Sequence, residues 1–200
     1  MTVVVRLVAT FASLSICSTV LAQTPPIRKW LDTEVAYTNA AGQVVVIQNS
    51  LPKGGGGYVH AADKQYSYVI FWTRITNKSA TPLRVTMNCP ADPITMFPSP
   101  TSHIRILLPP DTMTLDKVAL GDYGLTSLQS FVDERFKKPS TLEKTINPQE
   151  DHLFYMTVLM HQARGTARAA LTLRNDDLSL QIRIGTDSTV IPCGRLAFQN

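Results

Sequence analysis

Residues 66–89 read YSYVIFWTRITNKSATPLRVTMNC, and this stretch decides the fold class. Its first part, residues 66–76, is dense in aromatic and β-branched side chains, which favour strands. A turn-forming run follows at residues 77–82, and Leu83–Cys89 then alternates between apolar and polar side chains. Alternation with a period of two is typical of a strand with one buried face. We therefore expect two strands joined by a turn, with Cys89 on the buried face.

Short strands separated by turns continue on both sides of this stretch. Residues 43–48 and 153–160 are rich in β-branched or apolar side chains. Residues 167–173 and 178–184 alternate on either side of a turn made of Asn175, Asp176 and Asp177, as in a hairpin. Strands do not alternate regularly with helices along the chain. The pattern predicts a mainly β domain, built as an antiparallel β-sandwich, with a β-barrel as the alternative.

Part of the chain resembles an immunoglobulin-like domain. Residues 68–89 give an aromatic strand, a polar turn and an alternating strand that ends in a cysteine, and residues 145–150 lead into a second aromatic strand. The resemblance covers about half of the mature chain and implies an immunoglobulin-like β-sandwich. The cysteine spacing and an inserted helix depart from antibody-type domains, so no functional residues are carried over.

One short helix is expected between the strands. Apolar side chains at positions 125, 128, 131, 132 and 136 fall on one helical face. Thr126 and Gln129 have the spacing of a capping box, which would satisfy free amides of the first turn. Lys137, Lys138 and Pro139 would end the helix.

The chain divides into three parts. Residues 1–22 read as a signal peptide, residues 23–42 as an N-terminal lead-in without an assigned structure, and residues 43–200 as one β-sandwich domain. Within the domain, four glycines at positions 54–57 predict a surface loop. No Lys-Ser or Lys-Thr pair follows them to complete a phosphate-binding loop.

The first 22 residues predict export. Arg6 precedes an uncharged stretch that ends in Val20-Leu21-Ala22, a sequence that signal peptidase accepts. The stretch is short and diluted with Ser and Thr, which argues against a permanent membrane anchor. Ile16 before Cys17 argues against a lipoprotein. We expect a secreted or periplasmic protein, cleaved near Ala22, with no transmembrane segment in the mature chain.

Cleavage would leave two cysteines, Cys89 and Cys193. In an oxidising compartment they can form one intramolecular disulfide, which is the expected state. Two separate buried thiols are the alternative. Without Arg6, the chain carries 18 basic and 15 acidic side chains, spread without an obvious basic stripe. A nucleic-acid partner is therefore not expected.

No catalytic motif or cofactor fingerprint is present, and the four histidines lie far apart in the sequence, so neither a cofactor nor a metal site is predicted. The one speculative site is a loop between a strand and the helix, because loops on a rigid β scaffold often carry functional groups. The alternative is that its carboxylates only stabilise turns or pair with nearby cations. The residues of this candidate loop site are Asp111, Asp116, Asp122 and His103.

Three functions follow from these observations. The first is an exported, non-enzymatic binding or interaction module whose partner is a protein or another component of the cell envelope. The second is an exported hydrolase that uses the loop carboxylates. The third is an envelope assembly or chaperone-like factor that donates a strand to a client. A fold alone does not decide between them.

Overall fold

The computed structural model describes residues 27–61, 64–99 and 101–199. The predicted signal peptide, residues 1–22, lies outside the described residues. Within them, no helix is both long and apolar enough to cross a bilayer.

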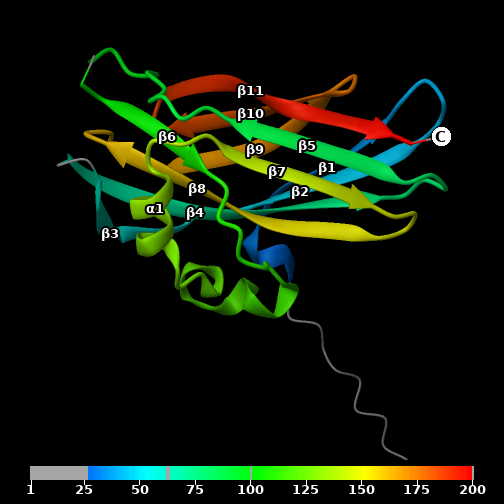
Figure 1. The fold of residues 1–200 in the computed structure, drawn as a ribbon, viewed down its shortest axis with the longest axis horizontal. Helices are drawn as coiled ribbons and strands as arrows, with labels where there is room; N and C mark the ends of the chain where they lie inside the picture. The colour runs from blue at the N-terminus through cyan, green and yellow to red at the C-terminus, as the bar shows by residue number, and fades with distance from the viewer. Residues whose placement is uncertain (1–26, 62–63, 100, 200) are drawn as a thin grey trace, which may run out of the picture.

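Two antiparallel sheets, A and B, form the body of the protein (Figure 1). They do not close into a barrel, so the alternative architecture is wrong. Sheet A has the order β1 (Leu31–Thr38), β2 (Val44–Ser50), β4 (Lys64–Asn77), β8 (Asp151–His161) and β6 (His103–Leu107), with β3 (Lys53–Ala61) paired to the other half of β4. Sheet B has the order β7 (Ser140–Ile146), β5 (Leu83–Cys89), β11 (Asp187–Phe198), β10 (Asp177–Ile184) and β9 (Ala167–Arg174).

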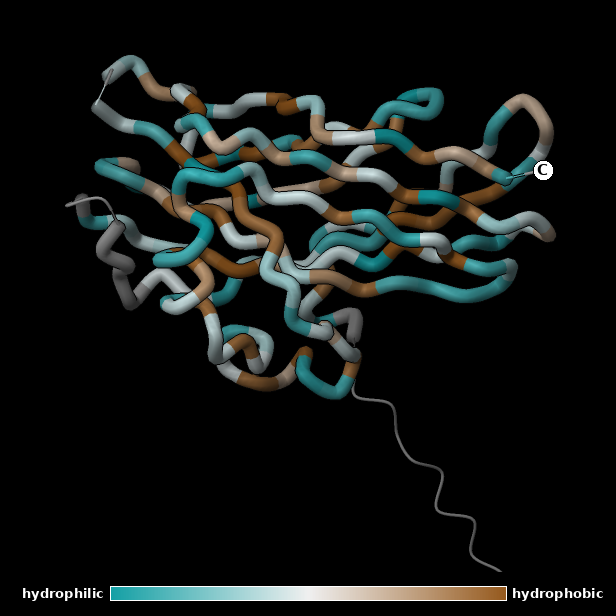
Figure 2. Tube along the Cα trace, viewed as in Figure 1, coloured by the Kyte–Doolittle hydropathy of each residue, from teal (hydrophilic) through white to brown (hydrophobic). Residues whose placement is uncertain are grey.

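The main core lies between the two sheets. The predicted alternation of β5 is confirmed, since Leu83, Val85, Met87 and Cys89 are buried and the residues between them are exposed. The predicted hairpin of β9 and β10 is also confirmed, with Ala169 and Ile182 as inward-facing partners. Alternating apolar and polar residues along these strands are visible in Figure 2. Burying one face of each strand removes apolar surface from water and holds the sheets together.

A third layer covers part of the outer face of sheet A. We call residues 109–139 the helical cap; they contain η2 (Leu115–Ala119), η3 (Gly121–Gly124) and α1 (Leu128–Arg135), as Figure 1 shows. Tyr66, Ile70 and Trp72 of β4 are buried in a second core beneath this cap. Phe71 points to the main core from the same strand. Strand β4 is therefore buried on both faces, which explains its density of large apolar side chains.

The structure differs from the sequence-based expectations at several elements. The lead-in contains η1 (Ile27–Trp30) and strand β1, which pairs with β2, so the sheet begins well before residue 43. The glycine run belongs to β3 and not to a loop; pairing with β4 shifts register between Gly54 and Tyr58. Helix α1 begins at Leu128 without the Thr126 capping box, because Ser127 occupies the N-cap position. Its hydroxyl donates to Asp111 rather than to the helix (2.7 Å).

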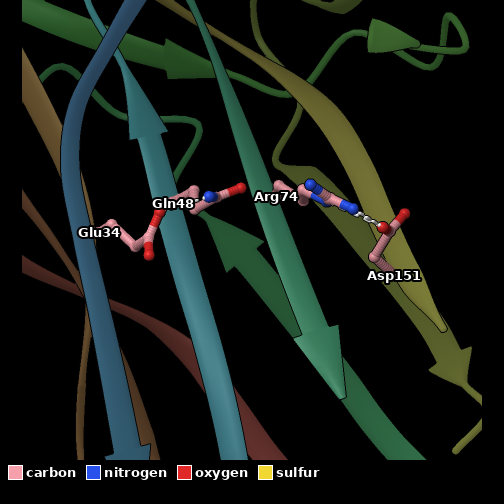
Figure 3. A network of polar contacts seen from close by, with 4 residues as sticks. All are labelled: Glu34, Gln48, Arg74 and Asp151. Carbon is pink, nitrogen blue, oxygen red and sulfur yellow. Dashed lines mark hydrogen bonds and ion pairs between the residues drawn. The ribbon is translucent and has the colours of Figure 1, made fainter. Parts of the chain in front are cut away.

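The part of sheet A beyond the cap carries a polar ladder across four strands. Figure 3 shows Glu34 of β1, Gln48 of β2, Arg74 of β4 and Asp151 of β8 side by side. Gln48 Nε2 donates to Glu34 at 2.6 Å, and Arg74 forms an ion pair with Asp151. Such cross-strand pairs keep an uncovered sheet face compatible with water.

The expected disulfide is absent: Cys89 and Cys193 are free, buried thiols. They lie on neighbouring strands of one sheet, β5 and β11. The Cys193 thiol donates to the backbone oxygen of Leu178 on β10, at 3.6 Å, on the opposite side of β11 from β5. Burial raises the pKa of both thiols to about 12, and the charge of Cys193 contributes to the increase at Cys89.

Candidate functional site

The four residues of the predicted loop site are associated with three different tyrosines of sheet A. His103, on β6, places Nε2 2.9 Å from the hydroxyl of Tyr66. Asp122, in η3, accepts a hydrogen bond of 2.7 Å from the hydroxyl of Tyr68. Two residues of the predicted set therefore contact two different tyrosines of β4.

Asp111 and Asp116 lie closer to a third tyrosine. Burial, followed by the negative charges of Asp111 and Asp116, raises the pKa of Tyr155 to about 12. Asp116 is exposed, and a hydrogen bond from the Thr114 side chain lowers the pKa of its carboxyl group. The predicted carboxylates therefore lie along the seam between the cap and sheet A. They interact with tyrosines of the sheet and with side chains of the cap.

One site on this seam is an open hollow that contains Asp122. Its volume is about 550 Å³, within the range of small-molecule sites. Segments that are far apart in the sequence build it: η1, the start of β3, the middle of β4, and η3. The lining side chains are those of Trp30, Lys53, Tyr68, Leu120 and Asp122.

Lys53 forms one wall of the hollow. Its Nζ donates to the backbone oxygens of Val118 and Leu120 at 2.7 and 2.6 Å. The same ammonium lies 4.0 Å from the ring centroid of Trp30 and 4.3 Å from that of Tyr123, so two aromatic faces stabilise its charge. Burial lowers the pKa of Lys53, and the charge of Asp122 opposes that effect. The sequence held no motif that marked this lysine.

The backbone that presents Asp122 is strained. Asp122 and the following Tyr123 have φ values of 48° and 53°, in the left-handed region that side chains other than glycine seldom adopt. Tyr123 is held in place by its hydroxyl, which donates to the backbone oxygen of Leu51 at 2.6 Å. Strained backbone of this kind persists where surrounding contacts hold it, and such positions cluster at functional sites.

Gly54 brings the floor of the hollow close to Tyr68. Its φ is +94°, and a Cβ atom there would lie 2.9 Å from a ring carbon of Tyr68. This close approach needs glycine at that position, which gives the start of the glycine run a structural role.

The scan of protein-family models finds no match, and no curated protein matches significantly. The function must therefore be inferred from the site itself. Within residues 27–61, 64–99 and 101–199, no cluster of three or more His, Cys, Asp or Glu could hold a metal ion. What the hollow offers is one carboxylate, one ammonium and the rings of Trp30 and Tyr68. These groups can bind and orient a ligand with apolar faces and hydroxyl donors.

A second cavity, of about 500 Å³, lies at one end of the sandwich between Tyr37, Leu173 and Phe198. Its polar side chains bond to the protein itself: Asn39 Nδ2 donates to Gln43 Oε1 at 2.8 Å, and Gln43 Nε2 donates to Thr81. These bonds close the β1–β2 turn and fasten it to the neighbouring loop. Asn175 and Asp176 also line this second cavity.

Proposed function

We propose that the protein is an exported, non-catalytic binding module whose ligand occupies the hollow beside Asp122. The single observation that carries this proposal is the strained pair Asp122-Tyr123. It holds a carboxylate at the rim of a hollow that also contains Trp30, Lys53 and Tyr68. Strained backbone that surrounding contacts hold in place is an expected property of a site formed before its ligand arrives.

The chemistry of the lining favours a saccharide unit of the cell envelope. The C–H faces of a sugar ring can lie against an aromatic ring, and its hydroxyl groups can donate to a carboxylate. Asp122 receives one bond from Tyr68 through Oδ2, and a carboxylate has acceptor capacity for several donors. Predominantly apolar walls with a few placed polar groups are typical of small-molecule sites.

Two further features complete the proposal. Export to the periplasm or the cell exterior rests on the signal-like residues 1–22, and the immunoglobulin-like form of the sandwich rests on the resemblance of residues 68–89. Binding is favoured over hydrolysis because, among the described residues, Asp122 is the one carboxylate that lines the hollow. Two carboxylates on opposite sides of a glycosidic bond would be expected of a hydrolase.

Titration calorimetry with neutral oligosaccharides, such as cellotriose and the N-acetylglucosamine trimer, tests this function. Trp30→Ala removes a ring and should weaken binding about tenfold or more, the equivalent of about 1.4 kcal/mol. Asp122→Asn keeps a residue that tolerates the left-handed backbone, and should also weaken binding. Asp116→Asn is the matched control, because Asp116 is exposed and lies outside the hollow.

The expected result is a ranking in which both hollow variants lose affinity and the control does not. Circular dichroism must show that each variant keeps its β structure. If no oligosaccharide binds, or if all three variants bind as the unchanged protein does, the saccharide site is wrong.

A further inference from the structure

The outer face of sheet B gathers arginine side chains from four strands. These arginines occupy outward-facing positions between inward-facing residues. Arg84, for example, lies between the buried Leu83 and Val85. Arg183 lies between the buried Ile182 and Ile184. None of the described lysines shares this pattern in sheet B. The arginines of the face are Arg84 of β5, Arg168 and Arg174 of β9, Arg183 of β10 and Arg195 of β11. We call this set the arginine face.

Two of these arginines stand directly opposite each other. Arg168 and Arg183 are Cα partners in the pairing of β9 with β10. Like charges in this position repel and destabilise a sheet. Among the residues that the structure describes, Asp32 of β1 forms an ion pair with Arg168, at 3.6 Å from its Nε. This end of the face therefore has more positive than negative charge.

The other end of the face is also incompletely neutralised. Arg174 on β9 and Arg195 on β11 are both Cα partners of Asp177 on β10, in the pairings on its two sides. Asp177 forms an exposed ion pair with Arg195, at 3.2 Å from its Nε. Arg84 forms an exposed ion pair with Glu143. Exposed ion pairs are weak and can be exchanged for a ligand anion at little cost.

The two ends are separated by a defined distance. Arg183 and Asp177 lie six residues apart on β10, which corresponds to about 20 Å at the usual rise of a strand. Between them the same face carries Thr172, Ser179 and Gln181, whose side chains can bond to hydroxyl groups. The face thus combines two cationic ends with an uncharged polar middle.

We propose that the arginine face binds a linear anionic polysaccharide that bears carboxylate groups and spans both cationic ends. Guanidinium groups match carboxylates in a two-bond geometry and are less strongly hydrated than ammonium groups, which suits arginine to this ligand. The polar middle suits the hydroxyl groups of a sugar chain better than a wholly charged or apolar partner. This surface shares no lining residue with the hollow beside Asp122.

The proposal predicts a length threshold. A ligand that reaches both ends gains from two attachments at once, whereas a short ligand gains from one. Digalacturonate is too short to span 20 Å, and an oligogalacturonate of eight units is long enough. We expect the longer oligomer to bind about tenfold or more tightly per molecule, with an affinity that falls as salt is added.

Paired charge removal tests the surface directly. The double variant Arg168→Gln, Arg183→Gln should lose about tenfold or more of the affinity for the eight-unit oligomer, measured by calorimetry at low salt. The double variant Lys137→Gln, Lys138→Gln removes the same charge from exposed positions after α1 and should lose less than about threefold. Removing Arg168 and Arg183 relieves their mutual repulsion, so the first variant is expected to fold.

Three results would overturn the proposal: an equal loss in both double variants, equal affinity for the short and long oligomers, or tighter binding of duplex DNA than of oligogalacturonate. Binding of neutral saccharides at the hollow is a separate measurement. A negative binding result at one site therefore does not affect the interpretation of the binding result at the other.

Discussion

The side-chain amide of Asn49 pairs with the backbone of Leu171 as another peptide group would. Leu171 N donates to Asn49 Oδ1 at 2.8 Å, and Asn49 Nδ2 donates to Leu171 O at 3.2 Å. Asn49 belongs to β2 of sheet A, and Leu171 belongs to β9, the last strand of sheet B. A side chain of one sheet thus satisfies the open edge of the other. The Thr73 hydroxyl also donates to Asn49 Oδ1, which fixes the orientation of the amide.

Replacing Asn49 should therefore destabilise the fold. Asn49→Ala leaves the buried N–H and C=O of Leu171 without partners, and we expect a loss of about 2–4 kcal/mol in the free energy of unfolding. Urea denaturation measures it. The matched control is Gln48→Ala, the preceding residue, whose bond to Glu34 is exposed and should be worth less than about 1 kcal/mol. Equal losses in the two variants would contradict this role.

Gly194 predicts a second stability difference. A Cβ atom at this position would collide with the backbone oxygen of Thr86 on the neighbouring strand and lie 2.9 Å from Met87 Cα. Gly194→Ala should cost about 3 kcal/mol or more, because the backbone of β5 at Thr86 and Met87 must move. Gly121→Ala is the control: nothing lies within 4 Å of its added Cβ, and the change should stay within about 0.5 kcal/mol. Thermal unfolding of both variants measures these losses, and equal losses would contradict the role of Gly194.

The tyrosines of the seam predict a loss of stability in alkali. A hydrogen bond to Asp122, followed by burial, raises the pKa of Tyr68 from 10.0 to about 12, and Tyr155 is raised to about 12 chiefly by burial. Raised pKa values mean that the neutral phenols favour the folded state. Their contribution is complete below pH 10 and disappears as the pH rises through about 12.

The measurement is the melting temperature as a function of pH. Asp122→Asn should lower the pKa of Tyr68 towards its ordinary value, which absorbance of the phenolate reports directly. A Tyr68 pKa that stays near 12 in this variant would show that burial, and not the Asp122 carboxylate, controls it.

The buried thiols predict low reactivity. A pKa of about 12 leaves almost no thiolate on Cys89 or Cys193 at neutral pH, and the thiolate is the reactive form. Ellman's reagent should label neither Cys89 nor Cys193 in the native state, and should label both after denaturation without reductant. No labelling after denaturation would reveal a disulfide in the isolated protein.

Much of the fold could be predicted because strand patterns are local. The alternation of Leu83–Cys89 identifies a buried face without knowledge of its partners. The sequence does not reveal strand β3, because the glycines of residues 54–57 lack side chains that would show a pattern. Strand β3 is stabilised by its pairing with β4, which the sequence of β3 alone does not indicate.

The site was harder to predict because its contacts are not local. The sequence shows Asp122 as a loop carboxylate, but nothing near it in the sequence indicates that the Tyr68 hydroxyl donates a hydrogen bond to it. The role of Lys53 is hidden for the same reason, because its ammonium contacts Trp30 and Tyr123, which lie far away in the sequence. Likewise, the arginines of sheet B are scattered along the chain and meet only once four strands are aligned.

The pairing of β4 with β8 also sets the order in which the chain can fold. Trp72 and Tyr155 are partners across these strands, although roughly 80 residues separate them, so a long loop must close first. The cap lies inside that loop and has no surface to rest on until both strands meet. Folding of the cap and of sheet A should therefore appear as one slow phase, in the millisecond-to-second range typical of sheets with distant partners.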